Sequence, residues 1–329
     1  MENKSLFKKL TASRELSLLI VLIVLCALIS IKTPTFLGWS NVSEILKNNS
    51  TTMIMALGML LVLLIGGIDI SIGSTLAFSG MTIGILYKYN HMSSTFLGFL
   101  LATVIGIACG LVIGLIIAYG KVSPIICTLG TMYVYRGFAY LVANDEWAGA
   151  DALGTFKDFA LKDFLGINSA VWITIICYVV FFIMMKWTKF GRNIYAVGSN
   201  EEAAEISGIN VRLVKTLVYT IMGGLSGLTG ALMTCVYASA QPNMATGKEM
   251  DVIAACVIGG VSMTGGRGSV LGALIGALIL SVISKALPLV GIDALAQNTV
   301  KGVIIIAVII LNVVTQRMMD KAALEKREM

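Results

Sequence analysis

Two ionisable side chains of this sequence stand in apolar surroundings, where a charge usually lines a cavity, meets a partner or caps a helix. Asp69 follows a Gly-Gly pair between two apolar stretches. Its position favours capping of the next helix over a direct role in a solute pathway. Arg136 lies inside the apolar stretch 123–143. We expect it to bind backbone carbonyls or an acid from another helix, with contact to a polar solute as the alternative.

A second group of candidates is an acid-bearing segment between basic residues, within the stretch 186–212. Ser199 is a suitable N-cap, three glutamates follow it, and Gly208 is placed to end the helix. A short helix over about 199–207 is therefore expected. Its residues by themselves favour a solvated loop helix, and the alternative is a docking helix for a cytoplasmic partner.

Residues for most enzymatic chemistry are missing from the sequence. His91 is the single histidine, and the six cysteines stand singly in apolar stretches, which argues against a metal site or a disulfide framework. The sequence contains no G-x-x-x-x-G-K-[ST] phosphate loop, no G-x-S-x-G elbow and no H-E-x-x-H motif. We predict no catalytic residue, no metal site and no cofactor in this chain.

The composition indicates which elements must position these residues. Of the 329 residues, 57% are hydrophobic and 13% are charged, whereas a soluble domain carries about 25% charged residues. The net charge of +6 is better explained by orientation in a membrane than by nucleic-acid binding. The apolar run from Leu16 lacks a small-residue cleavage site, so we expect it to be retained as the first helix.

Ten apolar stretches approach the about 20 residues that a helix needs to cross a bilayer. Ten crossings return the chain to its starting side, and lysine and arginine are more frequent on that side, so both termini are predicted to be cytoplasmic. We predict an all-α polytopic membrane protein, a single domain over 1–329 with its membrane region over 15–315. The candidate spans are 16–31, 50–66, 71–89, 95–119, 123–143, 169–187, 213–237, 249–263, 268–287 and 297–315.

Two loops between the predicted spans are long, and two stretches of the sequence are similar to each other. The predicted outer loop 144–168 is acidic and aromatic, and the predicted inner loop is 188–212. The stretch LLIGGIDISIGSTLAFSG (63–80) is similar to VIGGVSMTGGRGSVLGAL (257–274). Interrupted helices in two parts of a membrane chain are typical of a transport pathway. We therefore predict helix breaks at both Gly-Gly pairs, on the cytoplasmic side.

Four stretches of the sequence resemble the permease subunit of bacterial ribose-type monosaccharide ABC importers, and they occur in the order of that family. They are GGIDISIGS (66–74), TLGTMYVYRG (128–137), GRNIYAVGSNEEAAEISGI (191–209) and VIGGVSMTGGRGSVLGALIGA (257–277). The resemblance implies a multi-pass permease of the bacterial cytoplasmic (inner) membrane. It would move a monosaccharide, similar to ribose, rhamnose or a furanose signal, from a binding protein into the cytoplasm.

The resemblance also implies partners. They are cytoplasmic ATP-binding subunits that hold ATP and Mg, a periplasmic or lipid-anchored sugar-binding protein, a second permease copy or homologue, and membrane lipids, but no nucleic acid. The outer loop is the candidate docking surface for the binding protein. An ion-coupled secondary carrier and an ABC permease for nucleosides or branched-chain amino acids stay open as alternatives.

Residue roles follow from the resemblance as expectations. Coupling to the ATPase is assigned to Gly198, Asn200, Glu201, Glu202, Ala203, Ala204, Glu205 and Gly208. The candidate pathway or helix-break residues are Gly66, Gly67, Asp69, Ser71, Arg136, Gly259 and Gly260. For Asp69 and Arg136 we still expect structural roles.

Overall fold

The computed structural model describes residues 14–293, 296–303, 305–307 and 310. The predicted cytoplasmic termini fall largely outside these residues, as does the 311–315 part of the predicted span 297–315. The described part of that span is helical.

Seven helices within the described residues are long and apolar enough to cross a membrane, and they correspond to seven of the ten predicted spans. The all-α prediction is therefore confirmed for the described part of the chain. The seven are α2 (Arg14–Lys32), α3 (Trp39–Leu64), α5 (Thr95–Gly120), α6 (Pro124–Ala143), α7 (Ser169–Trp187), α10 (Val211–Tyr237) and α12 (Val270–Leu289).

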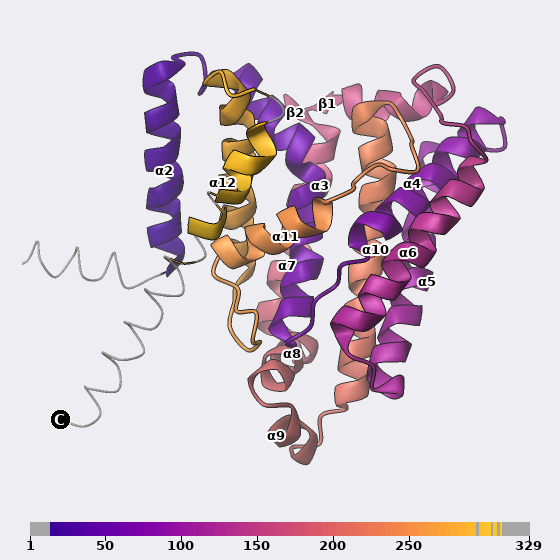
Figure 1. Cartoon of the computed structure of the whole chain (residues 1–329), viewed down its shortest axis with the longest axis vertical. Helices are drawn as coiled ribbons and strands as arrows, with labels where there is room; N and C mark the ends of the chain where they lie inside the picture. Colours follow the sequence, from indigo (N-terminus) through magenta and orange to yellow (C-terminus); the bar gives the residue numbers. More distant parts are fainter. Residues whose placement is uncertain (1–13, 294–295, 304, 308–309, 311–329) are drawn as a thin grey trace, which may run out of the picture.

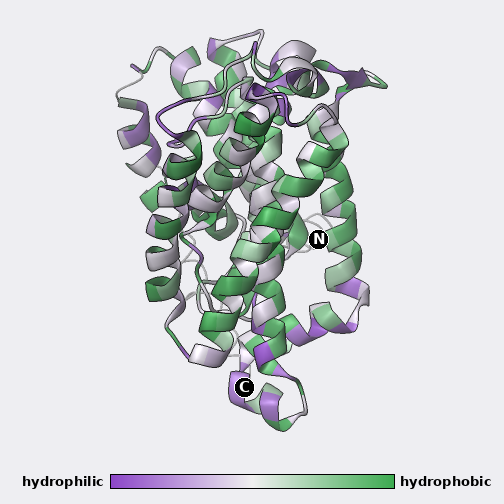
Figure 2. Cartoon of the chain, turned by 90° about the vertical axis from the view of Figure 1, so that its right-hand side faces the viewer, coloured by the Kyte–Doolittle hydropathy of each residue, from purple (hydrophilic) through white to green (hydrophobic). Residues whose placement is uncertain are grey.

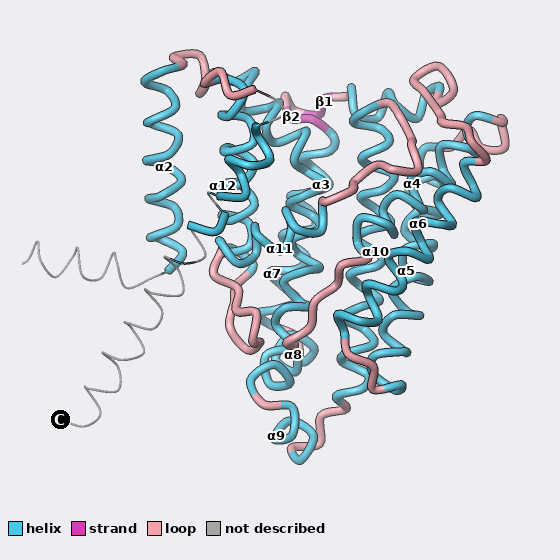
Figure 3. Tube along the Cα trace, viewed as in Figure 1, coloured by secondary structure: helices cyan, strands magenta, loops and turns pink. Residues whose placement is uncertain are grey.

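The third and eighth predicted spans form shorter helices. They are α4 (Ile72–Lys88) and α11 (Lys248–Ile258), of 17 and 11 residues. A long non-helical segment precedes each of them and runs through the body of the bundle (Figure 3). The predicted eighth span of 249–263 is thus too long, because the chain leaves the helix at the second Gly-Gly pair.

The remaining elements lie at the two ends of the bundle (Figure 1). One end carries a 3-10 helix η1 (Gly154–Leu161) and an antiparallel hairpin of β1 (Asp163–Phe164) and β2 (Ile167–Asn168). The opposite end carries α8 (Lys189–Ser199) and α9 (Glu201–Ile206). The helices therefore separate the predicted outer loop from the predicted inner loop.

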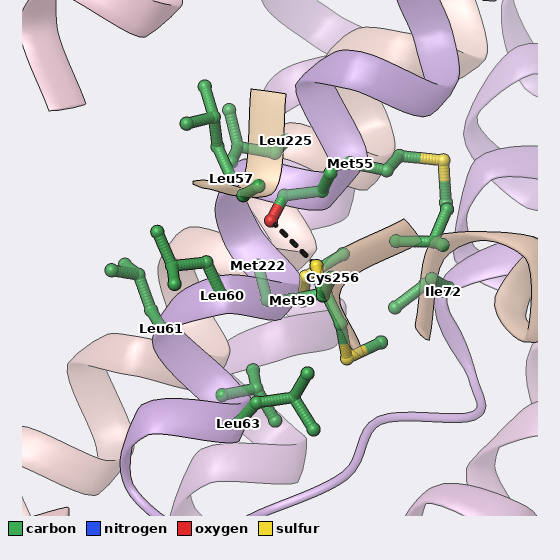
Figure 4. Close-up of a cluster of buried hydrophobic side chains, with 14 of the residues drawn as sticks. Met55, Leu57, Met59, Leu60, Leu61, Leu63, Ile72, Met222, Leu225 and Cys256 are labelled. Carbon is green, nitrogen blue, oxygen red and sulfur yellow. Dashed lines mark hydrogen bonds between the residues drawn. The ribbon is translucent and has the colours of Figure 1, made fainter. Parts of the chain in front are cut away.

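Helix α3 forms the centre of the fold, and every residue from Ser50 to Leu64 is buried. It packs against α7, α10, α11 and α12. Figure 4 shows its leucines and methionines among side chains of α10 and α11, where the Cys256 thiol donates to the carbonyl of Ala56 at 3.3 Å. The break that ends α3 thus lies at the end of the best-buried element.

The predicted start of this helix near residue 50 was wrong by about three turns. Residues 39–49 are rich in Ser, Asn and charged side chains, which resemble a loop in the sequence. They form the outer turns of α3, where polar side chains can reach solvent or partners. Glu44, for example, pairs with Lys285 of α12 at 2.8 Å.

Helices α5 and α10 pack with their backbones in contact. At Gly106 and Gly110 of α5, an added Cβ would overlap the backbone of Gly223 or Tyr219 of α10. Small residues allow this close approach between membrane helices. Apolar residues cover the middle of the helices, while hydrophilic residues gather mainly near the two ends (Figure 2). The exposed apolar faces suit contact with lipid.

Candidate coupling site and pathway

Helices α8 and α9 form a tight turn at one end of the bundle. Asn200 lies between them with extended backbone, and its side chain accepts a hydrogen bond from Ala203 N at 2.9 Å. Asn200 is therefore the N-cap, and the predicted cap at Ser199 was wrong. Ser199 is the last residue of α8, and its hydroxyl donates to Tyr195 O. Helix α9 is accordingly shorter than predicted.

Gly208 ends α9 as the sequence predicts. Its φ of +84° is left-handed, its N–H donates to Glu205 O at 3.0 Å, and Ile209 N donates to Ala204 O at 3.1 Å. This is a Schellman ending, which favours glycine at that position. The short helix is thus closed by a cap at each end.

The surface of α9 faces away from the bundle at most positions. Ala204 is buried, whereas Glu202, Ala203 and Glu205 are exposed. Ile206 is 83% exposed and stands beside these acids. The sequence prediction had not included Ile206.

One acid of α9 is already paired inside the chain. Both carboxylate oxygens of Glu201 lie 2.7 Å from Lys215 Nζ of α10. This ion pair attaches α9 to the first turns of α10. A cavity of about 490 Å³ opens beside it, and its lining includes Lys121, Glu205 and Arg212.

The first Gly-Gly pair ends α3. Gly66 has φ +73°, its N–H donates to Leu63 O, and Gly67 N donates to Val62 O, both at 2.9 Å. Gly66 supplies the left-handed residue of another Schellman ending. Gly67 has a different requirement, because an added Cβ there would overlap the Tyr219 hydroxyl.

The second Gly-Gly pair ends α11 in the same way, one residue out of register with the sequence similarity. Gly260 has φ +88° and donates to Val257 O, while Val261 N donates to Cys256 O. Gly260 thus corresponds to Gly66, not to Gly67. Gly259 is instead packed against the backbone of Gly272 in α12.

The first break, the end of α8 and the segment between α11 and α12 meet at one place, which we call the junction. It comprises Leu64, Gly198, Gly265 and Gly266. Gly266 N donates to Leu64 O at 2.9 Å, which joins the first break to the segment between α11 and α12. An added Cβ at Gly198 would overlap that same Leu64 carbonyl, so α8 presses directly on the break.

A side-chain bond reinforces the junction. The Tyr195 hydroxyl of α8 donates to Gly268 O at 2.8 Å. Residues 64, 198 and 266 are far apart in the sequence, so no local pattern could have predicted their contact. The end of α8 therefore contacts both the first break and the segment that follows the second break.

Asp69 lies in the first break and is only 1% exposed. Its Oδ1 accepts from Ser71 N at 2.9 Å and from Ser71 Oγ at 2.6 Å. Ser71 is the residue before α4. The carboxylate therefore closes the turn that leads into α4, but the N-cap of α4 is Ser71 and not Asp69, the residue that the sequence suggested.

Arg136 of α6 contacts the segment that leads into α11. Its Nη1 donates to Pro242 O at 2.7 Å and to Met244 O at 2.8 Å. Backbone carbonyls were among the partners that the sequence suggested. The guanidinium thus holds non-helical backbone in place, where unpaired carbonyls would be costly.

Within the described residues, no three His, Cys, Asp or Glu side chains stand close enough to bind a metal ion together. The charged groups of the site instead bond to backbone, form an ion pair or stay exposed.

Comparison with known proteins places this geometry in a family. The family model described as the branched-chain amino acid transport system / permease component matches residues 41–312. No solved structure matches the chain.

Three curated relatives are similar over most of their length. The ribose import permease protein RbsC of Escherichia coli (strain K12) is 38% identical over 297 residues, which cover 89% of this chain and 92% of that protein. Its counterpart in Bacillus subtilis (strain 168) is 37% identical, over 88% of this chain and 90% of that protein.

The third relative is the L-arabinose transport system permease protein AraH of Escherichia coli (strain K12). It is 33% identical, over 91% of this chain and 90% of that protein. These relatives are transporter permease subunits and not enzymes. The chain belongs to the permease-component family of ABC transport systems, as a multi-pass transmembrane protein.

Proposed function

We propose that this chain is the transmembrane permease subunit of an ATP-driven importer for a monosaccharide, in the cytoplasmic membrane of a bacterium. The curated relatives are named for ribose and L-arabinose, which are both pentoses, and they support a small monosaccharide as the cargo. ATP and Mg would be bound by a separate ATPase chain, and a binding protein would deliver the sugar from outside.

The observation that carries the proposal is the junction beneath α9. The exposed face of α9, with Glu202, Glu205 and Ile206, offers charge and an apolar contact to an ATPase. Because α8 contacts Leu64 and Gly266, a movement of this face would reach the first break and the segment that follows the second break. ATP binding could thus bias the permease between two states.

Non-helical backbone inside the bundle supports a pathway on one face. The segments 65–71 and 238–247 connect elements within the height of the bundle (Figure 3). Gln241, Asn243 and Thr246 of the second segment are exposed. Polar backbone at membrane depth is tolerated only against protein or a water-filled cavity. We infer that a second permease copy or a homologue covers this face, with the sugar path between them.

The same segments support ten crossings. Each non-helical segment with its short helix, α4 or α11, would complete one crossing. Helix α2 runs toward the end that carries β1 and β2 (Figure 1), which suits an N-terminus on the side of α8 and α9. Coupling helices face the ATPase, so both termini would be cytoplasmic.

The test is uptake of labelled ribose, L-arabinose or L-rhamnose by vesicles that contain the permease, its ATPase and its binding protein. Uptake should require ATP hydrolysis and should persist when ion gradients are collapsed. Uptake that follows an ion gradient without ATP would refute the proposal in favour of a secondary carrier.

A second candidate cargo comes from the family description, which names branched-chain amino acids. Competition by unlabelled leucine in the same vesicles would favour this alternative. Competition only by sugars would support the proposal.

A further inference from the structure

We propose that the hairpin Asp163–Asn168 is a membrane anchor, which inserts Phe164 and Leu165 into the interface of the outer leaflet. This inference goes beyond the proposed transport function. It uses the proposed orientation only to name the leaflet.

The tip of the hairpin is apolar and open. Phe164 is 64% exposed and Leu165 is 78% exposed. Leu161, the last residue of η1 and three positions before Phe164, is exposed as well. Three large apolar side chains on one short protrusion form a patch that water solvates poorly.

The backbone of the tip makes the presence of Leu165 unexpected. Leu165 and Gly166 both have positive φ, at +55° and +74°, between two paired strand residues. This is the geometry of a type I′ turn, which favours Asn-Gly. A leucine is disfavoured in that conformation, and the exposed Leu165 side chain does not pack in a hydrophobic core. A strained, exposed apolar residue points to a contact outside the chain.

The hairpin is held firmly enough to present its tip. Asn168 Nδ2 donates to Ala160 O at 2.8 Å and to Asp163 Oδ1 at 3.2 Å. The Ser169 hydroxyl donates to Lys162 O at 2.7 Å. The tip therefore keeps a fixed position relative to the start of α7.

The position of the tip favours lipid over a soluble partner. Trp172 of α7 donates its Nε1–H to Phe164 O at 2.9 Å, and the two rings lie 6.0 Å apart. Farther along α7, Ile176, Val179 and Val180 form an exposed apolar face of a candidate membrane span.

The patch is thus continuous with a surface that lipid must cover. Tryptophan is typical of the membrane interface, with its ring in the apolar region and its N–H satisfied. Lys162 is exposed next to the tip and can extend its ammonium to lipid phosphates. Asp163 is exposed as well, but its carboxylate accepts from Asn168.

The experiment places a tryptophan at the tip of the full chain, reconstituted in phosphatidylcholine vesicles. Leu165→Trp is compared with Thr155→Trp, a matched control at an exposed position of η1. Vesicles with phosphatidylcholine brominated near the headgroup end of its acyl chains quench fluorophores in the interface. We expect bromolipid to remove most of the emission added by Leu165→Trp and little of that added by Thr155→Trp. Aqueous iodide should act in the opposite order.

A second variant tests the anchor even if Leu165→Trp does not fold. Leu165→Asn retains the turn, because asparagine accepts the left-handed conformation. We expect native-like thermal unfolding. The emission of Trp172, which contacts Phe164, should shift to the red and become more open to iodide, because the polar tip no longer inserts beside it. If tryptophan at 165 is quenched by iodide as strongly as at 155 and is insensitive to bromolipid, the anchor is refuted. The tip would then be available to a soluble protein.

Discussion

The contact between Gly67 and Tyr219 allows a prediction with an internal control. An added Cβ at Gly67 would overlap the Tyr219 hydroxyl, while the next atoms, Tyr219 Cζ and Val62 O, would lie 3.3 Å away. Gly67 does not have a left-handed φ, so alanine meets no backbone penalty there. The cost of Gly67→Ala is therefore steric, about 1–3 kcal/mol for an overpacked core.

Removal of the overlapping atom should restore most of this stability. The Tyr219 hydroxyl is buried and has no hydrogen-bond partner among the described residues. Tyr219→Phe therefore loses no hydrogen bond, and it relieves a buried unsatisfied group that costs about 1–3 kcal/mol. In the Tyr219→Phe background, Gly67→Ala should cost little. The coupling energy of the double-mutant cycle should be about 1–3 kcal/mol.

The assay is thermal unfolding of the purified chain in detergent, followed by intrinsic fluorescence. One kcal/mol corresponds to about 2–4 °C in a domain of 150–250 residues and to less in a longer chain. Gly67→Ala alone should lower the midpoint by a few degrees, and the double variant should regain it. An equal loss from Gly67→Ala in both backgrounds would refute the reasoning, because the strain would then arise from another contact.

Three further predictions concern the ends of the bundle. In Gly198→Ala, the added methyl group would overlap the Leu64 carbonyl, and this backbone group cannot move aside as a flexible side chain could. The substitution should therefore abolish ATP-driven uptake and lower the unfolding midpoint. Glu202→Lys combined with Glu205→Lys should weaken association with the ATPase, measured by co-purification, with the unfolding midpoint unchanged. Lys88 Nζ and the Tyr89 hydroxyl each donate to Glu146 Oε2 at 2.7 Å, and these hydrogen bonds lower the pKa of Glu146. The stability contributed by the Lys88–Glu146 ion pair should therefore be fully present above the ordinary glutamate pKa of about 4.3. It should be lost as the pH falls through the lowered pKa of Glu146.

Each of these has a matched control. Gly130→Ala meets open space on α6 and should leave uptake intact. Equal loss of uptake in both glycine variants would contradict the junction. Asp145→Lys with Asp151→Lys reverses the same charge at the other end of the bundle and should spare ATPase binding. Glu146→Gln should remove the part of the pH dependence of the unfolding midpoint that comes from the pair with Lys88. If the plot of midpoint against pH is unchanged in this variant, the role of the ion pair is contradicted.

Local sequence signals predicted much of the site. Glycine in a left-handed conformation ends α3, α9 and α11, and in each case the sequence placed a glycine there. Arg136 was expected to bind backbone carbonyls or an acid, and it binds two carbonyls. Asp69 was expected to cap α4, and it instead accepts from Ser71, the N-cap residue. These features depend on a few neighbouring residues or on a single costly charge.

Other features depend on distant segments and could not be predicted. The polar start of α3 resembled a loop, because its partner Lys285 comes from the opposite end of the chain. Ser199 and Asn200 are both good caps, and the choice between them depends on how far α8 continues. The one-residue offset between the two breaks follows from close packing of Gly259 on Gly272.

The junction has a consequence for how the protein is made. The Leu64 carbonyl belongs to the first quarter of the chain, and the Gly266 N–H that it accepts from belongs to the last quarter. During synthesis the ribosome delivers α3 and α8 long before that donor exists. Until then the Leu64 carbonyl lacks this donor, and the contact between α3, α8 and residue 266 can be completed only near the end of translation. Chains that terminate before residue 266 should accordingly be recognised by membrane quality-control proteases, although most of their helices are already inserted.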